Sequence, residues 1–365
     1  MKQTLIAKDL SKKILMVGVY YKNNAPGGMA SVIDTYEKYI EQLRYIPSWK
    51  LSSRLTKIWY AFFAIVRYII LIIFDRKIKI IHIHGAANAS FDRKRIFIQI
   101  ARGFKKKIIY HIHASEFVPF YERHTRKEII INTICKCDKL IVLSKSWRNF
   151  FCRIGIPSEK IEILNNIVIP PVKMARKKES IEVDFLFLGE IGKRKGVYDL
   201  LQVIADNKPL FAGKMRLCIG GNLEEKIIKA FIKDNCISDI VTFKGWIKGE
   251  EKMQCLNWGD VYVLPSYNEG LPIAILEAMS YSHPVISTNV GGIPEILHSH
   301  KNGIMISPGN LDQLKNALLF FIEHPQKILE YGENAYETVQ PFFPQNVFNH
   351  LKAIYSGLLN EHSQQ

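Results

Sequence analysis

The sequence predicts an α/β protein with two doubly wound domains, each built on a parallel sheet. The chain has 365 residues, and since domains commonly hold about 150 residues, two are expected. Hydrophobic residues form 48% of the chain, which is enough for two cores. In both halves, continuous Val, Ile and Leu runs alternate with amphipathic stretches, as parallel strands do when helices cover both faces of their sheet. We expect a cleft between the two domains.

The first half contains four such apolar runs, each predicted to be a buried strand. They are residues 13–20, 79–86, 106–114 and 139–145. Helices are predicted over residues 31–43 and 93–104. Residues 55–74 are apolar over a length that could span a bilayer, but Lys57 and Arg67 interrupt them. Because an arginine at mid-bilayer is costly, we expect a helix against the sheet with its charges on the rim. A helix lying in the membrane interface remains open as an alternative.

A second series of apolar runs follows residues 170–180, a stretch rich in proline and charge that is predicted to be a linker. Strands are predicted over residues 183–191, 214–221, 240–246, 261–266 and 283–289. The stretch 345–359 reads as a final amphipathic helix. We therefore expect one domain over residues 1–172, a second over 173–341, and a C-terminal helix within 342–365.

The chain is strongly basic, with a formal net charge of +16 and a pI near 9.4. This charge indicates an anionic partner: nucleic acid, an acidic membrane face or a phosphorylated substrate. Composition alone does not choose among the three. Aromatic-interleaved basic stretches and recognised nucleic-acid modules are missing from the sequence. Six cysteines without regular spacing favour reduced thiols in a cytoplasmic protein. The N-terminus lacks the layout of a signal peptide.

Two loops between a predicted strand and a predicted helix suggest contacts with anions. In 24-NAPGGMAS-31, paired glycines let backbone N–H groups approach a phosphate beside a helix N-terminus. The loop is not G-x-G-x-x-G, and Gly27 and Gly28 also suit an ordinary tight turn. In 189-GEIGKRKGVYDLL-201, three basic residues crowd a helix start, where the dipole disfavours cations unless an anion lies between them. A solvated run of charges is the alternative.

The stretch 263-VLPSYNEGLPIAILEAMS-280 places two glutamates in a strand–loop–helix sequence. Glu269 is expected in the loop, and Glu277 about two turns into the helix, so that both can lie along one side of it. A loop carboxylate there can meet a ligand while the following amides hold a phosphate. The deeper glutamate can accept hydrogen bonds from a diol such as ribose. A helix cap for Glu269 and an ion pair for Glu277 explain the same spacing.

The context of this pair is more distinctive than the pair itself. The sequence resembles the retaining GT-B glycosyltransferases of family 4 over nearly its whole length, and most specifically in its C-terminal half. The stretches that carry the resemblance include the loop at residues 27–28, HIHASEF (111–117), VLSKS (142–146), ILNN (163–166), FLGEIGKRKGVYDLL (187–201), TFKGWIKGEEK (242–252), the Glu269–Glu277 pair, HPVISTNVGGIPEIL (283–297) and NGIMISPGNLDQL (302–314).

The resemblance implies two Rossmann-like domains facing each other across a cleft. The first takes the acceptor, the second takes a nucleotide-sugar donor, and the last helix crosses back to the first. Glu269 is expected to face the transferred sugar, and Glu277 the ribose. Lys195 is expected to hold the donor diphosphate, and His113 to reach the sugar near the reaction centre. Further donor-side residues are expected to be Gly27, Gly28, Arg194, Gly270, Leu271, Pro272 and Ile273, and acceptor-side residues His84, Ser115 and Glu116.

The chain departs from the family pattern at two places. The family has an arginine directly after the first glycine of the basic loop, where this chain has Glu190. A carboxylate cannot hold a diphosphate, so Arg194 or Lys193 supplies the charge, or donor binding is weaker; we expect Arg194. The second departure is at residues 41–56, where the second strand and its loop look abbreviated.

The resemblance also implies transfer with retention, in which Lys195, backbone amides and helix N-termini stabilise the leaving nucleoside diphosphate. No Asp-x-Asp sequence is present to hold Mg²⁺, so no metal and no cofactor are expected. The histidines of HIHGA (82–86) and HIHASEF are expected to be satisfied core or cleft residues rather than a metal site, since no acid cluster accompanies them.

The expected donor is a UDP-hexose or UDP-N-acetylhexosamine, with GDP-mannose second. The expected acceptor is a polyprenyl-diphosphate-linked saccharide of a bacterial surface polysaccharide. The enzyme is then expected in the cytoplasm, peripheral on the inner face of the membrane, where residues 58–74 and the lysines of 102–107 contact anionic lipid. The alternatives are a nucleotide-sugar epimerase on the same fold and a basic nucleic-acid-binding protein.

Overall fold

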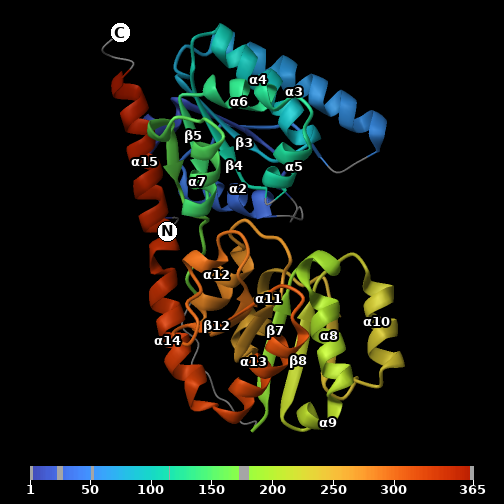
Figure 1. Cartoon of the computed structure of the whole chain (residues 1–365). Coiled ribbons are helices and arrows are strands. Elements are labelled where there is room, and N and C mark those ends of the chain that lie inside the picture. The colour runs from blue at the N-terminus through green and yellow to red at the C-terminus, as the bar shows by residue number, and fades with distance from the viewer. Residues whose placement is uncertain (1–2, 23–27, 51–52, 115, 172–180, 362–365) are drawn as a thin grey trace. The chain divides into compact units, whose positions relative to one another are not determined.

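The computed structural model of the chain describes residues 3–22, 28–50, 53–114, 116–171 and 181–361, and forms two compact units (Figure 1). The first unit holds Met1–Ile167 together with Pro344–Gln365, and the second holds Val168–Phe343. The C-terminal segment is therefore part of the first unit. The predicted linker lies almost wholly outside the described residues.

The first unit is built on a six-stranded parallel sheet of order β2-β1-β3-β4-β5-β6. Its strands are β1 (Ile14–Gly18), β2 (Tyr45–Pro47), β3 (Ile80–Gly85), β4 (Lys107–Ile112), β5 (Lys139–Val142) and β6 (Ile161–Ile163). Its helices are α1 (Lys8–Ser11), α2 (Gly28–Tyr39), α3 (Arg54–Phe74), α4 (Ala89–Gly103), α5 (Phe117–Arg123), α6 (Lys127–Cys135), α7 (Lys145–Arg153) and α15 (Pro344–Glu361).

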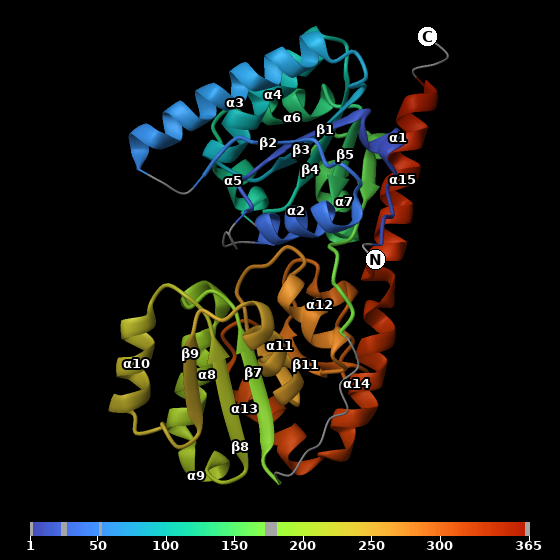
Figure 2. The ribbon, with the colours of Figure 1, turned by 180° about the vertical axis from the view of Figure 1, so that it is seen from behind.

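The two faces of this sheet differ because successive strand residues point to opposite sides. Ile81 and Ile83 of β3 belong to the large apolar core that α3 and α4 cover. Their neighbours His82 and His84 point to the opposite face, where residues of α2 and α15 meet them. Figures 1 and 2 show α3 and α4 together on one side of the sheet and α2 on the other.

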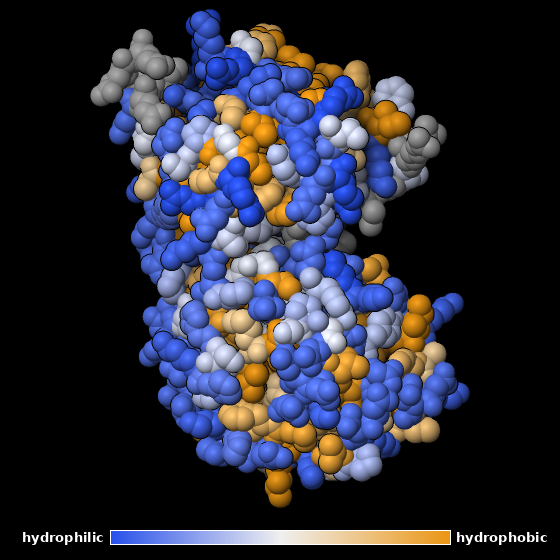
Figure 3. Space-filling model, in the orientation of Figure 1, coloured by the Kyte–Doolittle hydropathy of each residue, from blue (hydrophilic) through white to orange (hydrophobic). Residues whose placement is uncertain are grey.

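Helix α3 leaves most of its apolar surface exposed. Among its described side chains, only Ala64, Tyr68 and Ile72 are buried, and they form a single stripe at i, i+4 and i+8. Thr56–Phe74 is long and apolar enough to cross a membrane by length and composition, yet only 17% of it is buried inside the protein. Figure 3 shows hydrophobic side chains along the surface where Figure 1 places α3. The exposed ones are Ile58, Trp59, Phe62, Phe63, Val66, Ile70, Ile73 and Phe74.

The second unit repeats the architecture with a six-stranded parallel sheet of order β12-β11-β10-β7-β8-β9. Its strands are β7 (Val183–Leu188), β8 (Met215–Gly220), β9 (Val241–Gly245), β10 (Val261–Leu264), β11 (Val285–Thr288) and β12 (Gly303–Ile306). Its helices are α8 (Val197–Asp206), α9 (Lys208–Phe211), α10 (Glu225–Asp234), α11 (Gly249–Trp258), α12 (Ile273–Ser280), α13 (Leu311–Glu323) and α14 (Gln326–Val339).

Each sheet has one point at which its strand order reverses. In the first unit it lies between β1 and β3, and in the second unit between β7 and β10. At such a point the loops that follow the two strands diverge, and the space between them is where ligands of doubly wound sheets bind. The predicted fold class, α/β with two doubly wound parallel sheets, is confirmed. In the second unit, the switch point places a candidate ligand site between the loops that follow β7 and β10.

Candidate active site

A buried ion pair joins the two loops at the switch point of the second unit. Lys195 ends a short 3-10 helix, η2 (Lys193–Lys195), in the loop that follows β7, and Glu269 lies in the loop after β10. The Lys195 ammonium is 2.5 Å from Oε1 of Glu269, and the two side chains are 15% and 6% exposed. Ser266 donates to the same oxygen at 2.8 Å. The other oxygen of Glu269, Oε2, accepts no hydrogen bond from the residues that the structure describes.

The second glutamate has its own lysine. Both oxygens of Glu277 lie 2.6 Å from the Nζ atom of Lys252, which extends from α11. Glu277 is the fifth residue of α12, so it lies a little more than one turn into the helix; the predicted two turns were wrong. The helix begins only after Pro272, whose ψ of 119° keeps the preceding backbone extended.

One buried phenol, that of Tyr262, is influenced by the charges of both carboxylates. Tyr262 of β10 donates from its hydroxyl to the Leu188 carbonyl at 2.7 Å. Burial, and then the negative charges of Glu277 and Glu269, raise the pKa of Tyr262 well above its ordinary value. Both carboxylates therefore act electrostatically on the same buried hydroxyl.

Two glycines hold the backbone of the Glu269 loop in place. Gly196 has φ +69°, and a Cβ atom there would lie 2.0 Å from the Pro265 carbonyl oxygen. Gly291 has φ +58°, and its Cβ would lie 1.9 Å from the Glu269 carbonyl oxygen. Neither position accepts a side chain, since both the backbone conformation and the space require glycine. The loop is therefore fixed from both sides before any ligand arrives.

Replacing Gly291 with alanine is expected to lower the free energy of unfolding by at least about 2 kcal/mol. The cost of a left-handed backbone conformation for alanine and the cost of the clash between its Cβ atom and the backbone add to each other. It is also expected to displace Glu269 and weaken ligand binding. Gly213 offers a matched control, with φ +70° and nothing within 4 Å of its added Cβ. Urea unfolding of the two variants checks this. Equal losses would show that Gly291 contributes only its backbone conformation.

The expected replacement for the missing family arginine has two partners in the structure. Arg194 donates from Nη1 to the Asn268 carbonyl at 3.3 Å, and its Nη2 is 3.4 Å from Oε2 of Glu190. Its guanidinium thus lies beside the residue that precedes Glu269, while Glu190 offsets part of its charge. The exposed Lys193 has no side-chain partner among the described residues.

The remaining predicted residues divide between the two units. Gly270, Leu271 and Pro272 follow Glu269, Ile273 begins α12, and Leu271 is buried. Gly28, His84, His113 and Glu116 belong to the first unit, where Gly28 is the first residue of α2. Gly27 and Ser115 lie outside the described residues.

Four histidines form a stack at the carboxyl ends of β3 and β4. His84 and His111 face each other across the strand pair. His84 Nδ1 is 2.9 Å from His113 Nε2, and His82 Nε2 is 3.3 Å from His111 Nδ1. The hydroxyl of Tyr355, from α15, is 2.6 Å from His82 Nδ1. The C-terminal helix thus hydrogen-bonds to the histidine stack.

Burial keeps these imidazoles neutral. It lowers the pKa of His82 and of His113 to about 3, and the pKa values of His84 and His111 well below their ordinary value. His82, His84 and His111 each place one ring nitrogen within 4.8 Å of the others, and neutral imidazole is the form that binds metals such as Zn²⁺. The prediction of satisfied histidines is met only in part, because His84 Nε2 and His111 Nε2 have no partner among the described residues.

Several residues around both strand ends were not predicted. Lys94 of α4 is fully buried at the end of β1, where its ammonium donates to the Gly18 carbonyl at 3.1 Å and to the Ser48 hydroxyl. No carboxylate pairs with it among the described residues, and burial lowers its pKa well below the ordinary value. Ser266, Lys252, Gly196 and Gly291 were also missed, although all four lie in stretches that resemble the family.

Models of glycosyltransferase families match both units of the chain. Residues 173–338 match the model of the glycosyl transferases group 1, and residues 29–170 match that of glycosyltransferase family 4. The two matches share no residue and leave only the ends of the chain and a short connection uncovered.

Individual relatives are distant. A 41.2 kDa protein of the cps region of Klebsiella pneumoniae is 24% identical over 71% of this chain and 75% of its own length. The colanic acid biosynthesis glycosyltransferase WcaL of Escherichia coli is 24% identical over 58% of this chain and 54% of its own length. Among solved structures, HepE of Anabaena in complex with UDP superposes with a TM-score of 0.72 at 16% identity, over 94% of this chain and 100% of HepE.

Proposed function

Because the chain belongs to the GT-B glycosyltransferases of family 4, we propose that it transfers a sugar from a nucleoside-diphosphate sugar to a lipid-linked saccharide. We further propose that transfer retains the anomeric configuration and serves the synthesis of a bacterial surface polysaccharide. The relatives from the cps region and from colanic acid biosynthesis support this setting.

The observation that carries the proposal is the Lys195–Glu269 pair at the switch point of the second unit. A leaving nucleoside diphosphate develops negative charge, and a fixed ammonium in a largely buried site stabilises it. The sugar left behind gains positive, oxocarbenium-like character, which the adjacent Glu269 carboxylate stabilises. One ion pair thus supplies both charges that the transition state requires. Before the donor binds, these two opposite charges lie 2.5 Å apart and neutralise each other.

Other residues then take the parts of the donor that do not react. Glu277, oriented through both of its oxygens by Lys252, accepts hydrogen bonds from the ribose hydroxyls. Arg194 adds charge toward the diphosphate, and Glu190 reduces it. Amides at the start of α12 have no partner within the helix and point toward anions.

UDP is the nucleotide with the most support, because HepE has been solved with UDP and with UDP-glucose. We propose a UDP-hexose or UDP-N-acetylhexosamine as donor, with GDP-mannose second. Lys195 and the amides are proposed to act without a metal ion or other cofactor. The family assignment does not favour an epimerase.

The acceptor is proposed to be a polyprenyl-diphosphate-linked saccharide, which places the enzyme at the cytoplasmic face of the membrane. The exposed apolar surface of α3 supports this placement, since soluble proteins rarely leave such a surface uncovered. Phe104 and Lys105 are exposed beyond the end of α4, and Lys106 donates to the Ile78 carbonyl just past α3. Basic side chains thus accompany the apolar helix, as in proteins that bind anionic leaflets.

A panel of nucleotide sugars tests the donor site. One UDP-sugar is expected to raise the melting temperature of the protein and, with lipid-linked saccharides as acceptor, to release UDP. Lys195→Ala is expected to weaken donor binding about tenfold to a hundredfold, because a charge-assisted contact to phosphate is lost. Lys193→Ala removes the same charge two residues away and is expected to bind almost normally. If both variants bound like the wild type, the donor site would lie elsewhere.

A further inference from the structure

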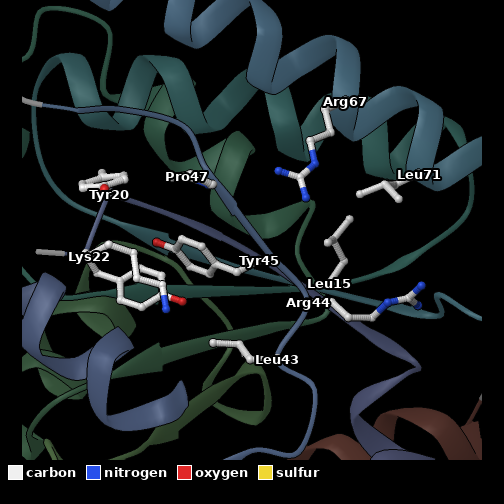
Figure 4. Close-up of a pocket in the computed structure, with 10 residues that line it drawn as sticks. Leu15, Tyr20, Lys22, Leu43, Arg44, Tyr45, Pro47, Arg67 and Leu71 are labelled. Atoms are coloured by element: carbon white, nitrogen blue, oxygen red, sulfur yellow. The ribbon is translucent and has the colours of Figure 1, made fainter. Parts of the chain in front are cut away.

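A cavity of about 330 Å³ lies in the first unit beneath α3 (Figure 4). Its walls come from β1 and the residues after it, from β2 with the residues before it, and from α3. The volume is at the lower end of the range for small-molecule sites. No residue assigned above to donor binding or catalysis lines it.

The charge of this cavity is positive, and one cation is unpaired. Its lining contains three cationic side chains and no acid. Lys22 is paired with Glu37, and Arg44 with Asp75. The third, Arg67, forms no ion pair or hydrogen bond with the residues that the structure describes. Figure 4 shows its guanidinium extending from α3 toward Tyr45 and Pro47. The cavity therefore has room for one compensating negative charge.

The position of Arg67 joins this cavity to the exposed apolar surface. Residues three and four apart are neighbours on a helix, so Arg67 adjoins Phe63 on one side and Ile70 on the other. Phe63 is 62% exposed and Ile70 49% exposed. A ligand with its charge at Arg67 can thus continue along an apolar helix face. This combination of one anion and a long apolar part is the chemistry of a phospholipid.

We propose that this cavity binds the phosphodiester headgroup of an anionic membrane lipid, whose acyl chains lie along the exposed face of α3. The proposal rests on the membrane contact proposed above and adds a specific lipid site to it. A phosphodiester carries a single negative charge and so matches the single unpaired guanidinium. Arginine also forms paired, charge-assisted hydrogen bonds to phosphate oxygens. Tyr20 and Tyr21 also line the cavity.

Vesicle co-sedimentation with a matched pair of variants tests the site. The full-length protein is expected to bind phosphatidylcholine vesicles that contain phosphatidylglycerol more tightly than vesicles of phosphatidylcholine alone. Arg67→Gln is expected to reduce this binding about tenfold or more. Arg76→Gln makes the same change just beyond the end of α3, at an exposed residue that does not line the cavity, and is expected to bind almost as the wild type does.

Equal losses in the two variants would overturn the proposal, because they would show general attraction to an anionic surface. Unchanged binding by Arg67→Gln, or self-association through α3 without vesicle binding, would overturn it as well. Both positions are exposed, so neither substitution is expected to change the melting temperature. Unchanged melting temperatures confirm that the variants are folded.

Soluble probes identify the source of the phosphate. Monomeric dihexanoylphosphatidylglycerol is expected to protect β2 and α3 from hydrogen exchange in the wild type and not in Arg67→Gln. Protection by inorganic phosphate alone would show an anion site without lipid specificity and would contradict the proposal. The donor panel reports independently on the second unit: if no nucleotide sugar binds while the lipid results hold, the transferase proposal fails and the lipid site stands.

Discussion

Glu269→Gln is expected to lower the rate of sugar transfer by about a hundredfold to a thousandfold, the usual loss when one fixed electrostatic group is removed from a transition state. Glutamine keeps the shape of the side chain and an oxygen for the Ser266 hydroxyl, which donates to Glu269 at 2.8 Å. What is lost is the charge, both toward the oxocarbenium-like sugar and toward the Lys195 ammonium. Donor binding is expected to change much less than the rate, because the lysine remains for the diphosphate.

The control for this experiment is Glu190→Gln, which makes the same chemical change in the neighbouring loop. Glu190 pairs with Arg194 at 3.4 Å and is exposed. Neutralising it frees Arg194, so donor binding is expected to tighten while transfer persists. Rates of nucleotide release at saturating donor separate the two variants. Full activity of Glu269→Gln would remove this residue from the reaction.

Acidification is expected to destabilise the first unit between pH 6.5 and about pH 3. The folded state holds the pKa of His82 and of His113 at about 3, whereas the unfolded chain protonates near 6.5. In this window the unfolded state binds more protons, so stability is present above pH 6.5 and is lost as the pH falls. Each of these two histidines is expected to cost about 2 kcal/mol between pH 7.5 and pH 5.

Urea unfolding across this pH range, with hydrogen exchange in β3 and β4 to assign the transition to the first unit, measures the effect. His82→Gln is expected to flatten the pH dependence, whatever it does to the stability at neutral pH. His350→Gln, at an exposed position on α15, is expected to leave the slope unchanged. An unaltered slope in His82→Gln would show that the buried imidazoles do not cause the acid sensitivity.

The fold was predictable because most strands of a doubly wound sheet are buried on both faces and therefore appear as continuous apolar runs. The predicted strand at residues 183–191 became β7 (Val183–Leu188), for example. The strands that escaped prediction, β6 and β12, are short and only partly buried. The equally short β10 and β11 were predicted because every one of their residues is buried. The abbreviated second strand expected at residues 41–56 is β2.

The site was predictable only as far as its loops. The sequence, through its resemblance, indicated Lys195 and Glu269 as functional, but no spacing shows that residues 74 positions apart form a hydrogen bond. The same holds for Lys252 and Glu277. Gly291 was part of a quoted stretch, yet its importance depends on a backbone oxygen of Glu269 that only the folded chain brings there. Contacts across a switch point are set by strand order, which one sequence does not display.

The histidine stack shows a different limit. The period of two correctly indicated that His82 and His84 share a face of β3. The partner of His82, however, is Tyr355, 273 residues later, and nothing near either residue indicates this pairing. The sequence also could not predict that His84 Nε2 and His111 Nε2 lack a hydrogen-bond partner among the described residues. Whether a buried atom finds a partner depends on all the side chains that the fold brings near it.

The position of α15 also determines which of the two units can complete its folding first during translation. The first unit is assembled from two segments, and the second of these, Pro344–Gln365, is translated only after the whole of the second unit, which is the continuous segment Val168–Phe343. Domains fold as units while the chain emerges, so the second unit has its full sequence first. Until α15 is translated, Tyr36 and His82 lack Phe348 and Tyr355, the aromatic side chains that meet them. A truncation that removes the residues after Phe343 is therefore expected to spare the second unit and to leave the first unit unfinished.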